Sequence, residues 1–375
     1  MSFQVFENKE HKMVRSNHYN YNFNKINGHF ERWGRSFEDD PAFAPSPEIL
    51  DIEVTTICKG PNGKLCPFCY KSNNPSGHNM SFDIFKNIFD KISKNKILTQ
   101  IAFGADAQAT ANPDLFKMMQ YARSKDVIPN ITVADIDNET ALKLSNVCGA
   151  VAVSVYKHAG KDIAYNSIKR LSDAGLEQIN IHFMLSDETF DDAFEIMNDS
   201  ISDSRLCNLN AIVFLSLKQK GRGVKFNTIS QDNYKKLVDY AFDNNISIGF
   251  DSCSAPTFIN SVKDKKNFDL LYEMSEPCES TLFSSYINEH GIFFPCSFTE
   301  NWKEGNWENG LSVLDSDDFV SDIWNHPKTV FFRNSLIQNT DLNKCRNCPA
   351  YSVCGIDMRL PYTIVNENHS SLSFL

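Results

Sequence analysis

The chain has 375 residues, of which 42% are hydrophobic and 12% aromatic, and its formal net charge is −10. This length can bury a large core and favours one large domain with an appendage, or two domains. The acidic balance argues against wide contact with a nucleic-acid backbone. No run of 18 apolar residues and no basic-then-apolar leader occurs, so we expect a cytoplasmic protein that does not contact membranes.

The first 47 residues predict a polar and aromatic extension. Asn27-Gly28 separates two aromatic segments, residues 19–23 and 29–33, and this dipeptide favours the tight turn of a β-hairpin. Three prolines between residues 41 and 47 then predict a connector.

From residue 48 to about residue 250, short apolar strands alternate with amphipathic helices. Ser81 and Ser230 are expected to be helix N-caps, and Gly175 fits a helix C-terminus. Repeated strand–helix units with crossovers imply a parallel sheet, either open or barrel-like. Six such units are too few for a complete eight-fold barrel. The strands are expected near residues 52–54, 101–103, 131–133, 151–155, 179–183 and 211–215.

The regular pattern ends near residue 251, and the tail to residue 375 holds six of the eleven cysteines. An odd number of cysteines at short spacings fits a reducing compartment and metal binding better than disulfides. We therefore expect residues 251–375 to form a second, smaller domain held together by metal.

Three cysteines, Cys58, Cys66 and Cys69, follow the first strand of the alternating region. Parallel α/β folds place their sites in such loops, after the carboxyl end of a strand. Three thiolates on one loop can hold three irons of a [4Fe–4S] cluster and leave the fourth iron open to another molecule. The alternative is a structural zinc ion with His78 as its fourth ligand.

This loop resembles that of the radical S-adenosylmethionine superfamily. Its members carry three cysteines after strand one, usually with three residues between the first two cysteines. Seven residues separate Cys58 from Cys66 here, whereas the spacing of Cys66 and Cys69 is kept. Phe68 matches an aromatic position that packs near the adenine in the family.

The resemblance extends along the second strand, where residues 103–114 are similar to the family's Gly-Asp-Gly-Glu-Pro-Thr segment. That segment contacts the amino group of the cofactor's methionine. Gln108 stands in place of the glutamate, and its carbonyl can accept a hydrogen bond from an ammonium. Ser154 and His182 match family positions near the ribose and the cofactor. An exposed loop glutamine is the alternative for Gln108, and ordinary barrel packing is the alternative for Ser154 and His182.

The tail resembles the auxiliary iron–sulfur domain of the same superfamily, called SPASM in its full form and twitch in its shortened form. The resemblance rests on Gly291, which four residues separate from Cys296, and on a Cys-x2-Cys-x5-Cys run. Met358 replaces the next cysteine of the full form, so the resemblance implies one auxiliary [4Fe–4S] cluster. Zinc at the same cysteines is the alternative. The expected auxiliary ligands are Cys278, Cys296, Cys345 and Cys348, with Cys354 as a spare or a replacement.

Two further features are left open. Cys253 could be another ligand or could face the substrate. A basic segment, residues 217–223, follows the sixth strand, and folded over the site it could hold a carboxylate of cofactor or substrate. A solvated loop is the alternative for this segment.

The resemblance therefore implies a radical S-adenosylmethionine enzyme with a partial (β/α)6 TIM-like barrel at residues 48–250 and a SPASM/twitch-like domain at residues 251–375. Such an enzyme cleaves S-adenosyl-L-methionine reductively to a 5′-deoxyadenosyl radical, which abstracts hydrogen from the substrate. It needs an electron donor such as flavodoxin or ferredoxin, and no catalytic residue beyond the cofactor ligands is expected.

Enzymes with this tail often modify peptides or proteins, as in maturation of ribosomally made peptides and oxidation of sulfatase cysteines. This analogy favours a peptide or protein substrate. Dehydrogenation or rearrangement of a small molecule is one alternative. A non-catalytic iron–sulfur or zinc protein is the other.

Overall fold

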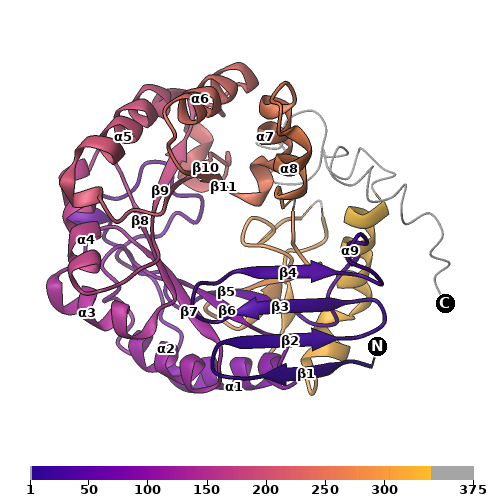
Figure 1. The fold of residues 1–375 in the computed structure, drawn as a ribbon. Helices are drawn as coiled ribbons and strands as arrows, with labels where there is room; N and C mark the ends of the chain where they lie inside the picture. Colours follow the sequence, from indigo (N-terminus) through magenta and orange to yellow (C-terminus); the bar gives the residue numbers. More distant parts are fainter. Residues whose placement is uncertain (1, 277, 304, 339–375) are drawn as a thin grey trace.

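The structure is a computed structural model that describes residues 2–276, 278–303 and 305–338 (Figure 1). It contains a four-stranded antiparallel sheet near the N-terminus and a mixed sheet of ten strands. No helix in these ranges is long and apolar enough to cross a membrane.

The N-terminal sheet runs in sequence order, and its last two strands form the predicted hairpin. Gly28 in that turn has a φ of +75°, a left-handed conformation that glycine adopts without strain. Tyr19, which precedes the third strand, and Tyr21 and Phe23 within it share one buried cluster with Ile97 and Ile128. The strands are β1 (Gln4–Glu7), β2 (His11–Arg15), β3 (Asn20–Asn24) and β4 (Phe30–Trp33).

The centre of the molecule is a partial barrel, in which the strands are parallel and follow sequence order. Six strand–helix units are present as predicted, and β11 adds a seventh parallel strand. The helices form an outer ring around the strands (Figure 1). The strands are β5 (Ile49–Glu53), β6 (Gln100–Gly104), β7 (Ile128–Val133), β8 (Ala150–Ser154), β9 (Ile179–Leu185), β10 (Ala211–Ser216) and β11 (Ile248–Phe250). The helices are α1 (Phe82–Ser93), α2 (Leu115–Ser124), α3 (Asn138–Val147), α4 (Lys161–Asp173), α5 (Phe190–Ser202) and α6 (Gln231–Asp243).

The predicted helix caps are in place. The Ser81 side chain accepts a hydrogen bond from the Ile84 amide, and the Ser230 side chain accepts one from the Asn233 amide. Gly175 follows α4 with a φ of +85°. Local sequence signals therefore set the ends of these helices.

The two faces of the barrel strands differ in polarity. Along β9, Ile179, Ile181 and Phe183 are buried in the core under the helices, and the residues between them are partly exposed. The partly exposed set includes Asn180 and His182. Since successive side chains of a strand point to opposite faces, these residues line the inside of the barrel, which solvent reaches.

The tail continues the barrel sheet instead of starting a separate one. Its first strand pairs in parallel with β5, with Ser284 opposite Ile49, and the next two strands add on antiparallel. Trp307 and Trp324 are buried in the tail. The domain boundaries at residues 47/48 and 250/251 stay predictions. The remaining elements are α7 (Ala255–Val262), α8 (Phe268–Glu273), β12 (Ser284–Ile287), β13 (Ile292–Phe294), β14 (Leu311–Ser312) and α9 (Pro327–Gln338).

Short helical turns carry several of the loops. The 3-10 helices are η1 (Pro61–Gly63), η2 (Asp187–Thr189), η3 (Ser204–Leu206), η4 (Gly221–Lys225) and η5 (Ser252–Ser254). A single turn of π-helix is η6 (Val320–Trp324).

Candidate metal centre and cofactor site

The first cysteine loop, residues 58–73, leaves the carboxyl end of β5. Cys58, Cys66 and Cys69 are partly exposed and carry free thiols. Burial raises the pKa of the Cys66 thiol to about 12, and nearby Cys69 and Cys58 act in the same direction. Because ionised thiols here would repel one another, binding as thiolates requires a cationic partner such as a metal centre.

The long gap between Cys58 and Cys66 folds into a compact turn. The Gly60 amide donates to the Cys58 sulfur at 3.3 Å, and the Lys64 amide closes η1 on the Pro61 carbonyl at 3.0 Å. Gly60 has a φ of +71°, and a Cβ atom there would lie 2.0 Å from the Lys64 carbonyl oxygen. The four extra residues are therefore taken up locally, and the chain returns to Cys66.

The basic segment after β10, residues 217–223, lies on this loop. We call this segment and the three residues after it, residues 217–226, the strap. The Arg222 Nε donates to the Cys66 carbonyl at 2.8 Å, and its Nη1 donates to the Asn73 carbonyl at 3.0 Å. The Arg222 amide also donates to the Cys69 carbonyl at 3.0 Å. The guanidinium therefore holds the backbone of the cysteine loop, a contact that the sequence did not predict.

Phe68, the predicted adenine neighbour, is buried beside the cysteines. Its ring centre lies 5.5 Å from that of Tyr156 and 5.8 Å from that of Phe226. An aromatic wall built from the loop, the end of β8 and the strap therefore stands at this position. Tyr156 carried no sequence signal of its own.

Gln108 connects the first cysteine loop to the neighbouring strand ends. Its Nε2 donates to the Gly60 carbonyl at 3.1 Å and lies 3.4 Å from a carboxylate oxygen of Asp135, which follows β7. Its carbonyl oxygen has no hydrogen-bond partner among the residues that the structure describes. That oxygen can accept a hydrogen bond from an ammonium, as predicted. The sequence analysis did not single out Asp135.

Ser154 and His182 are opposite one another in the register of β8 and β9. The His182 Nδ1 lies 3.3 Å from the Thr132 hydroxyl. Burial lowers the pKa of His182 to about 4, so the imidazole is neutral at physiological pH. The structure thus gathers Phe68, Ser154 and His182 at one end of the barrel, and their contact with a cofactor stays a prediction.

The donor set fits an iron–sulfur cluster by its chemistry. Three thiols stand on one loop, an amide donates to one sulfur, and the Arg222 charge acts on Cys66. His78, the fourth ligand of the zinc alternative, packs its ring 5.7 Å from that of His290. Within the described ranges, no three or more His, Cys, Asp or Glu side chains are grouped as a site for a single metal ion.

Comparison with known proteins identifies solved structures with a similar fold. No protein-family model and no curated protein matches the sequence. Solved structures of SuiB from Streptococcus suis match over most of the chain. In the structure bound to precursor peptide SuiA, the match covers 94% of each chain at a TM-score of 0.68 and 12% identity. SuiB alone gives 0.64 at 13% identity, over 92% of this chain and 94% of that one. SuiB bound to S-adenosylmethionine gives 0.60 at 15% identity, over 83% and 72%.

The chain shares the fold of SuiB. At 12–15% identity the likeness is one of fold. Cys58, Cys66 and Cys69 stand on the loop after β5, the first strand of the partial barrel.

A second group of cysteines lies in the tail. Cys253, Cys278 and Cys296 come from η5, the segment before β12 and the segment after β13. Burial raises the pKa of the Cys278 thiol to about 12, with Cys253 and Cys296 acting in the same direction, and Ser280 hydrogen-bonds to both Cys278 and Cys296. Cys253, for which the sequence left open a ligand role or a place facing the substrate, thus lies near Cys278 and Cys296. Cys345, Cys348 and Cys354 lie outside the described residues.

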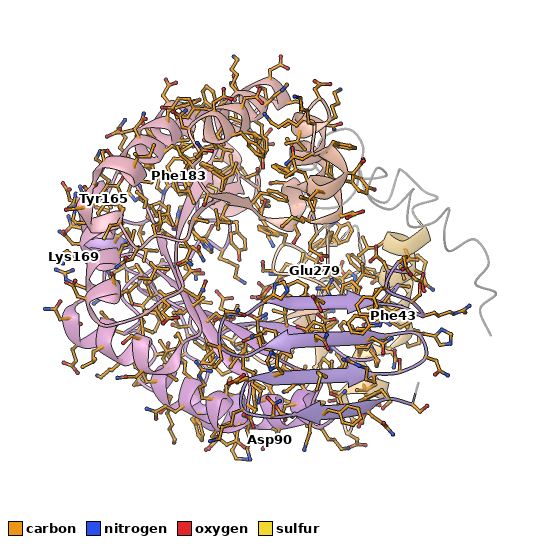
Figure 2. The ribbon with its side chains drawn as sticks, viewed as in Figure 1. Phe43, Asp90, Tyr165, Lys169, Phe183 and Glu279 are labelled. Atoms are coloured by element: carbon orange, nitrogen blue, oxygen red, sulfur yellow. The ribbon has the colours of Figure 1, made fainter. Side chains whose placement is uncertain are left out.

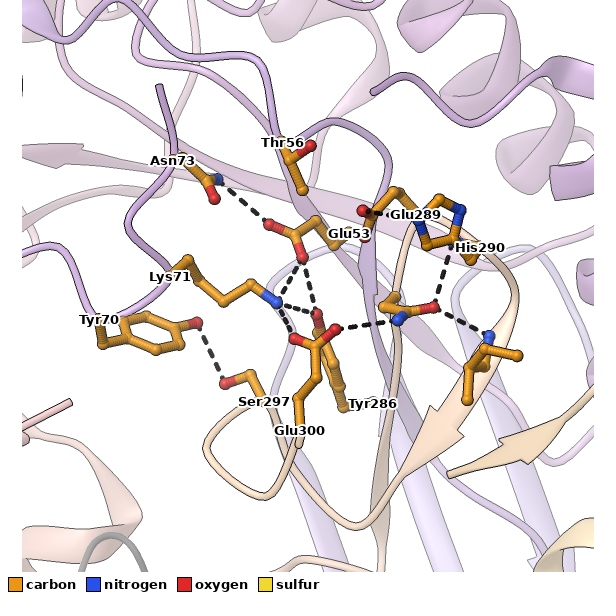
Figure 3. A network of polar contacts seen from close by, with 12 residues as sticks. Glu53, Thr56, Tyr70, Lys71, Asn73, Tyr286, Glu289, His290, Ser297 and Glu300 are labelled. Atoms are coloured by element: carbon orange, nitrogen blue, oxygen red, sulfur yellow. Dashed lines mark hydrogen bonds and ion pairs between the residues drawn. The ribbon is translucent and has the colours of Figure 1, made fainter. Parts of the chain in front are cut away.

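The two cysteine groups are joined by a buried polar network (Figure 3). Tyr70, next to Cys69, donates to the Ser297 hydroxyl at 3.1 Å. The Lys71 ammonium contacts Glu53 at 2.7 Å and is paired with Glu300. Burial opposes the charge of Lys71, but the two carboxylates raise its pKa above the ordinary value. Ser297 and Glu300 are more than 200 residues from Tyr70 and Lys71 along the chain, so no local pattern revealed these two contacts.

Proposed function

We propose that this chain is a radical S-adenosylmethionine enzyme. The observation that carries the proposal is the set of three thiols, Cys58, Cys66 and Cys69, on the loop after β5 of this fold. We assign these thiols to a [4Fe–4S] cluster, with S-adenosylmethionine bound beside it.

When bound, the cluster and S-adenosylmethionine would supply reductive cleavage to methionine and a 5′-deoxyadenosyl radical that abstracts a hydrogen atom. The protein's part is to bind and orient. Phe68 and Tyr156 offer ring faces for the adenine, and the Gln108 carbonyl accepts from the methionine ammonium. His182 is neutral, so it adds no positive charge beside the sulfonium.

We propose a peptide or protein substrate that enters the inside of the barrel. Two observations support this: the inner face of β9 is reached by solvent, and the SuiB structure that matches over 94% of both chains is bound to a precursor peptide.

We further propose an auxiliary [4Fe–4S] cluster. The described residues offer Cys253, Cys278 and Cys296 as three of its ligands, and the predicted Cys345, Cys348 and Cys354 are candidates for the fourth. An external one-electron donor such as flavodoxin or ferredoxin would reduce the protein in the cytoplasm.

The decisive experiment is anaerobic turnover of S-adenosylmethionine by the reconstituted and reduced protein. We expect 5′-deoxyadenosine and methionine from the wild-type chain and none above background from Cys69→Ala. Cys207→Ala, a substitution of an exposed cysteine outside both groups, should keep the activity. Cleavage retained by Cys69→Ala would show that the cluster assignment is wrong.

Metal analysis tests the auxiliary site separately. One [4Fe–4S] cluster brings about four irons per chain and two bring about eight. We expect about eight in the wild type and about four in Cys296→Ala. About four irons in the wild type would exclude the auxiliary cluster, and stoichiometric zinc would favour the zinc alternative.

A further inference from the structure

The strap touches both cysteine groups. Beyond the strap's contacts with the first cysteine loop, its Lys220 ammonium donates to three carbonyl oxygens of the second cysteine loop, residues 296–300. The acceptors are the carbonyl oxygens of Ser297 at 3.5 Å, Phe298 at 3.0 Å and Glu300 at 2.9 Å. A lysine ammonium has three donors, so all of them are directed at this one turn.

The two cations hold backbone, not side chains. Lys220 is bound to carbonyls that follow Cys296, and Arg222 is bound to carbonyls at Cys66 and Asn73. Hydrogen bonds from charged donors are the stronger kind. Because these bonds are made to backbone carbonyls, they fix the path of the loop independently of its side chains. Residues that position a loop act in this way.

Gly221, between Lys220 and Arg222, allows the strap to pack closely against the first cysteine loop. Gly221 has a φ of +56°, and a Cβ atom there would lie 2.3 Å from the Tyr70 carbonyl oxygen and 2.7 Å from that of Cys69. No side chain fits into this contact. The backbones of strap and loop are therefore packed directly on one another.

The first residues of the strap also contact the segment that carries Cys253. Lys218 forms an ion pair with Asp251, and both side chains are shielded from solvent. Asp251 precedes η5, the turn that contains Cys253, and the Ser254 side chain of that turn also contacts it. One ten-residue strap thus contacts every described segment that carries a candidate ligand except the one at Cys278.

We propose that the strap is a positional clamp that fixes the two cysteine loops relative to one another. A change in the conformation of either loop therefore changes the conformation of the other. Lys220 and Arg222 are its positioning residues. The coupling belongs to the folded chain, and only its consequence for cluster loading rests on the proposed function.

The test compares Lys220→Met with Arg222→Met in the full chain before metal reconstitution. Of the two loops, the Lys220 side chain hydrogen-bonds to the second and the Arg222 side chain to the first. An effect of either variant on the loop to which its residue is not hydrogen-bonded is therefore evidence for the clamp. The readout is the rate of iodoacetamide alkylation at Cys69 and at Cys296, followed by mass spectrometry. We expect Lys220→Met to change the rate at Cys69, and Arg222→Met to change the rate at Cys296, each by about fivefold or more.

Lys225→Met is the matched control. Lys225 is an exposed lysine of the same strap, and its substitution should alter neither rate. The double variant Lys220→Met/Arg222→Met should change each rate by less than the product of the single effects, as coupled positions do. Lys220→Arg keeps the positive charge and its donors, so its alkylation rates at Cys69 and Cys296 should be close to those of the wild type.

If each variant alters only the loop that it touches, the clamp is excluded. If Lys220→Met does not fold, Lys220→Gln, which keeps an amide donor, is measured in its place against the same criterion. A wild-type chain that binds no iron would overturn the proposed function and leave this alkylation test intact. If iron is bound, Lys220→Met should also change the electron paramagnetic resonance signal of the cluster at Cys58, Cys66 and Cys69.

Discussion

At the scale of single residues, the two ends of the Gln108 side-chain amide have different roles. Its nitrogen donates to the carbonyl of Gly60, two residues after Cys58, and lies near Asp135, which follows β7. Its carbonyl oxygen is left for an ammonium. From the sequence alone, a glutamate here would be the better partner for a cofactor's amino group, because a carboxylate adds charge.

The contacts of the Gln108 amide nitrogen make Gln108→Glu unfavourable for the stability of the fold. A carboxylate cannot donate, and one of its oxygens would meet the Gly60 carbonyl and the Asp135 carboxylate. We expect the free energy of unfolding to fall by about 1–3 kcal/mol, measured by urea denaturation. Gln120→Glu, on the exposed face of α2, should change it by less than about 0.5 kcal/mol. Equal stability in the two variants would contradict the contacts assigned to Gln108.

His182 gives the protein a pH dependence. Its pKa is lowered to about 4 by burial, against an ordinary value of 6.5. The unfolded chain therefore binds a proton between pH 6.5 and pH 4 that the folded chain does not, and stability falls as the pH is lowered through this range. We expect His182 to contribute a loss of about 2–3 kcal/mol. In His182→Gln, denaturation curves at pH 7 and pH 4.5 should differ by correspondingly less, and an unchanged difference would refute this role.

At the scale of elements, the strap and the first cysteine loop depend on a glycine. Gly221→Ala places an alanine in the left-handed backbone conformation and adds a Cβ atom that overlaps the Tyr70 carbonyl oxygen. Gly175→Ala, after α4, adds only the conformational strain, since no atom lies within 4 Å of its Cβ position.

We expect Gly175→Ala to lower the free energy of unfolding by about 1 kcal/mol and Gly221→Ala to lower it by at least about 2 kcal/mol. Only Gly221→Ala should also speed hydrogen exchange at the amides of Cys69 and Ser72. The same loss in both variants would mean that the strap does not lie against the loop.

At the scale of the whole molecule, one arginine joins the N-terminal sheet to the rest of the chain. Arg32 of β4 contacts Glu48 at 3.0 Å and Glu279 at 2.6 Å, and Glu279 lies next to β4 (Figure 2). Burial raises the pKa of Glu48 to about 7 even with Arg32 beside it. Since Glu279 follows Cys278, this contact also reaches the second cysteine group.

Arg32→Met would leave these two buried carboxylates without their cation. We expect the free energy of unfolding at pH 8 to fall by about 3–5 kcal/mol, and by less at pH 6, where Glu48 can take up a proton. Limited proteolysis should then cut near residues 34–40 first. Arg35→Met, at an exposed position nearby, is the control. A loss independent of pH would argue against the role of Glu48.

Much of the fold could be predicted because its signals are local. The alternation of apolar strands with amphipathic helices predicts a parallel sheet, and Ser81, Ser230 and Gly175 mark helix ends through contacts within three residues. The three-cysteine loop was visible for the same reason, since its ligands lie within twelve residues of one another.

The connections between distant segments could not be predicted. The pairing of β12 with β5 depends on which sheet edge is free after the barrel strands are placed, and Ser284 and Ile49 are opposite only in the folded chain. Cys253 had no motif because its neighbours Cys278 and Cys296 arrive from other segments.

The sequence by itself determined which chemistry we propose, since the number and spacing of thiols on one loop depend only on neighbouring residues. The tertiary structure decided how that chemistry is held. Lys220 and Arg222 read in sequence as a solvated basic segment or a carboxylate site, yet they bind backbone carbonyls of two loops. A carbonyl carries no side-chain signature, and only the folded chain brings these cations and carbonyls together.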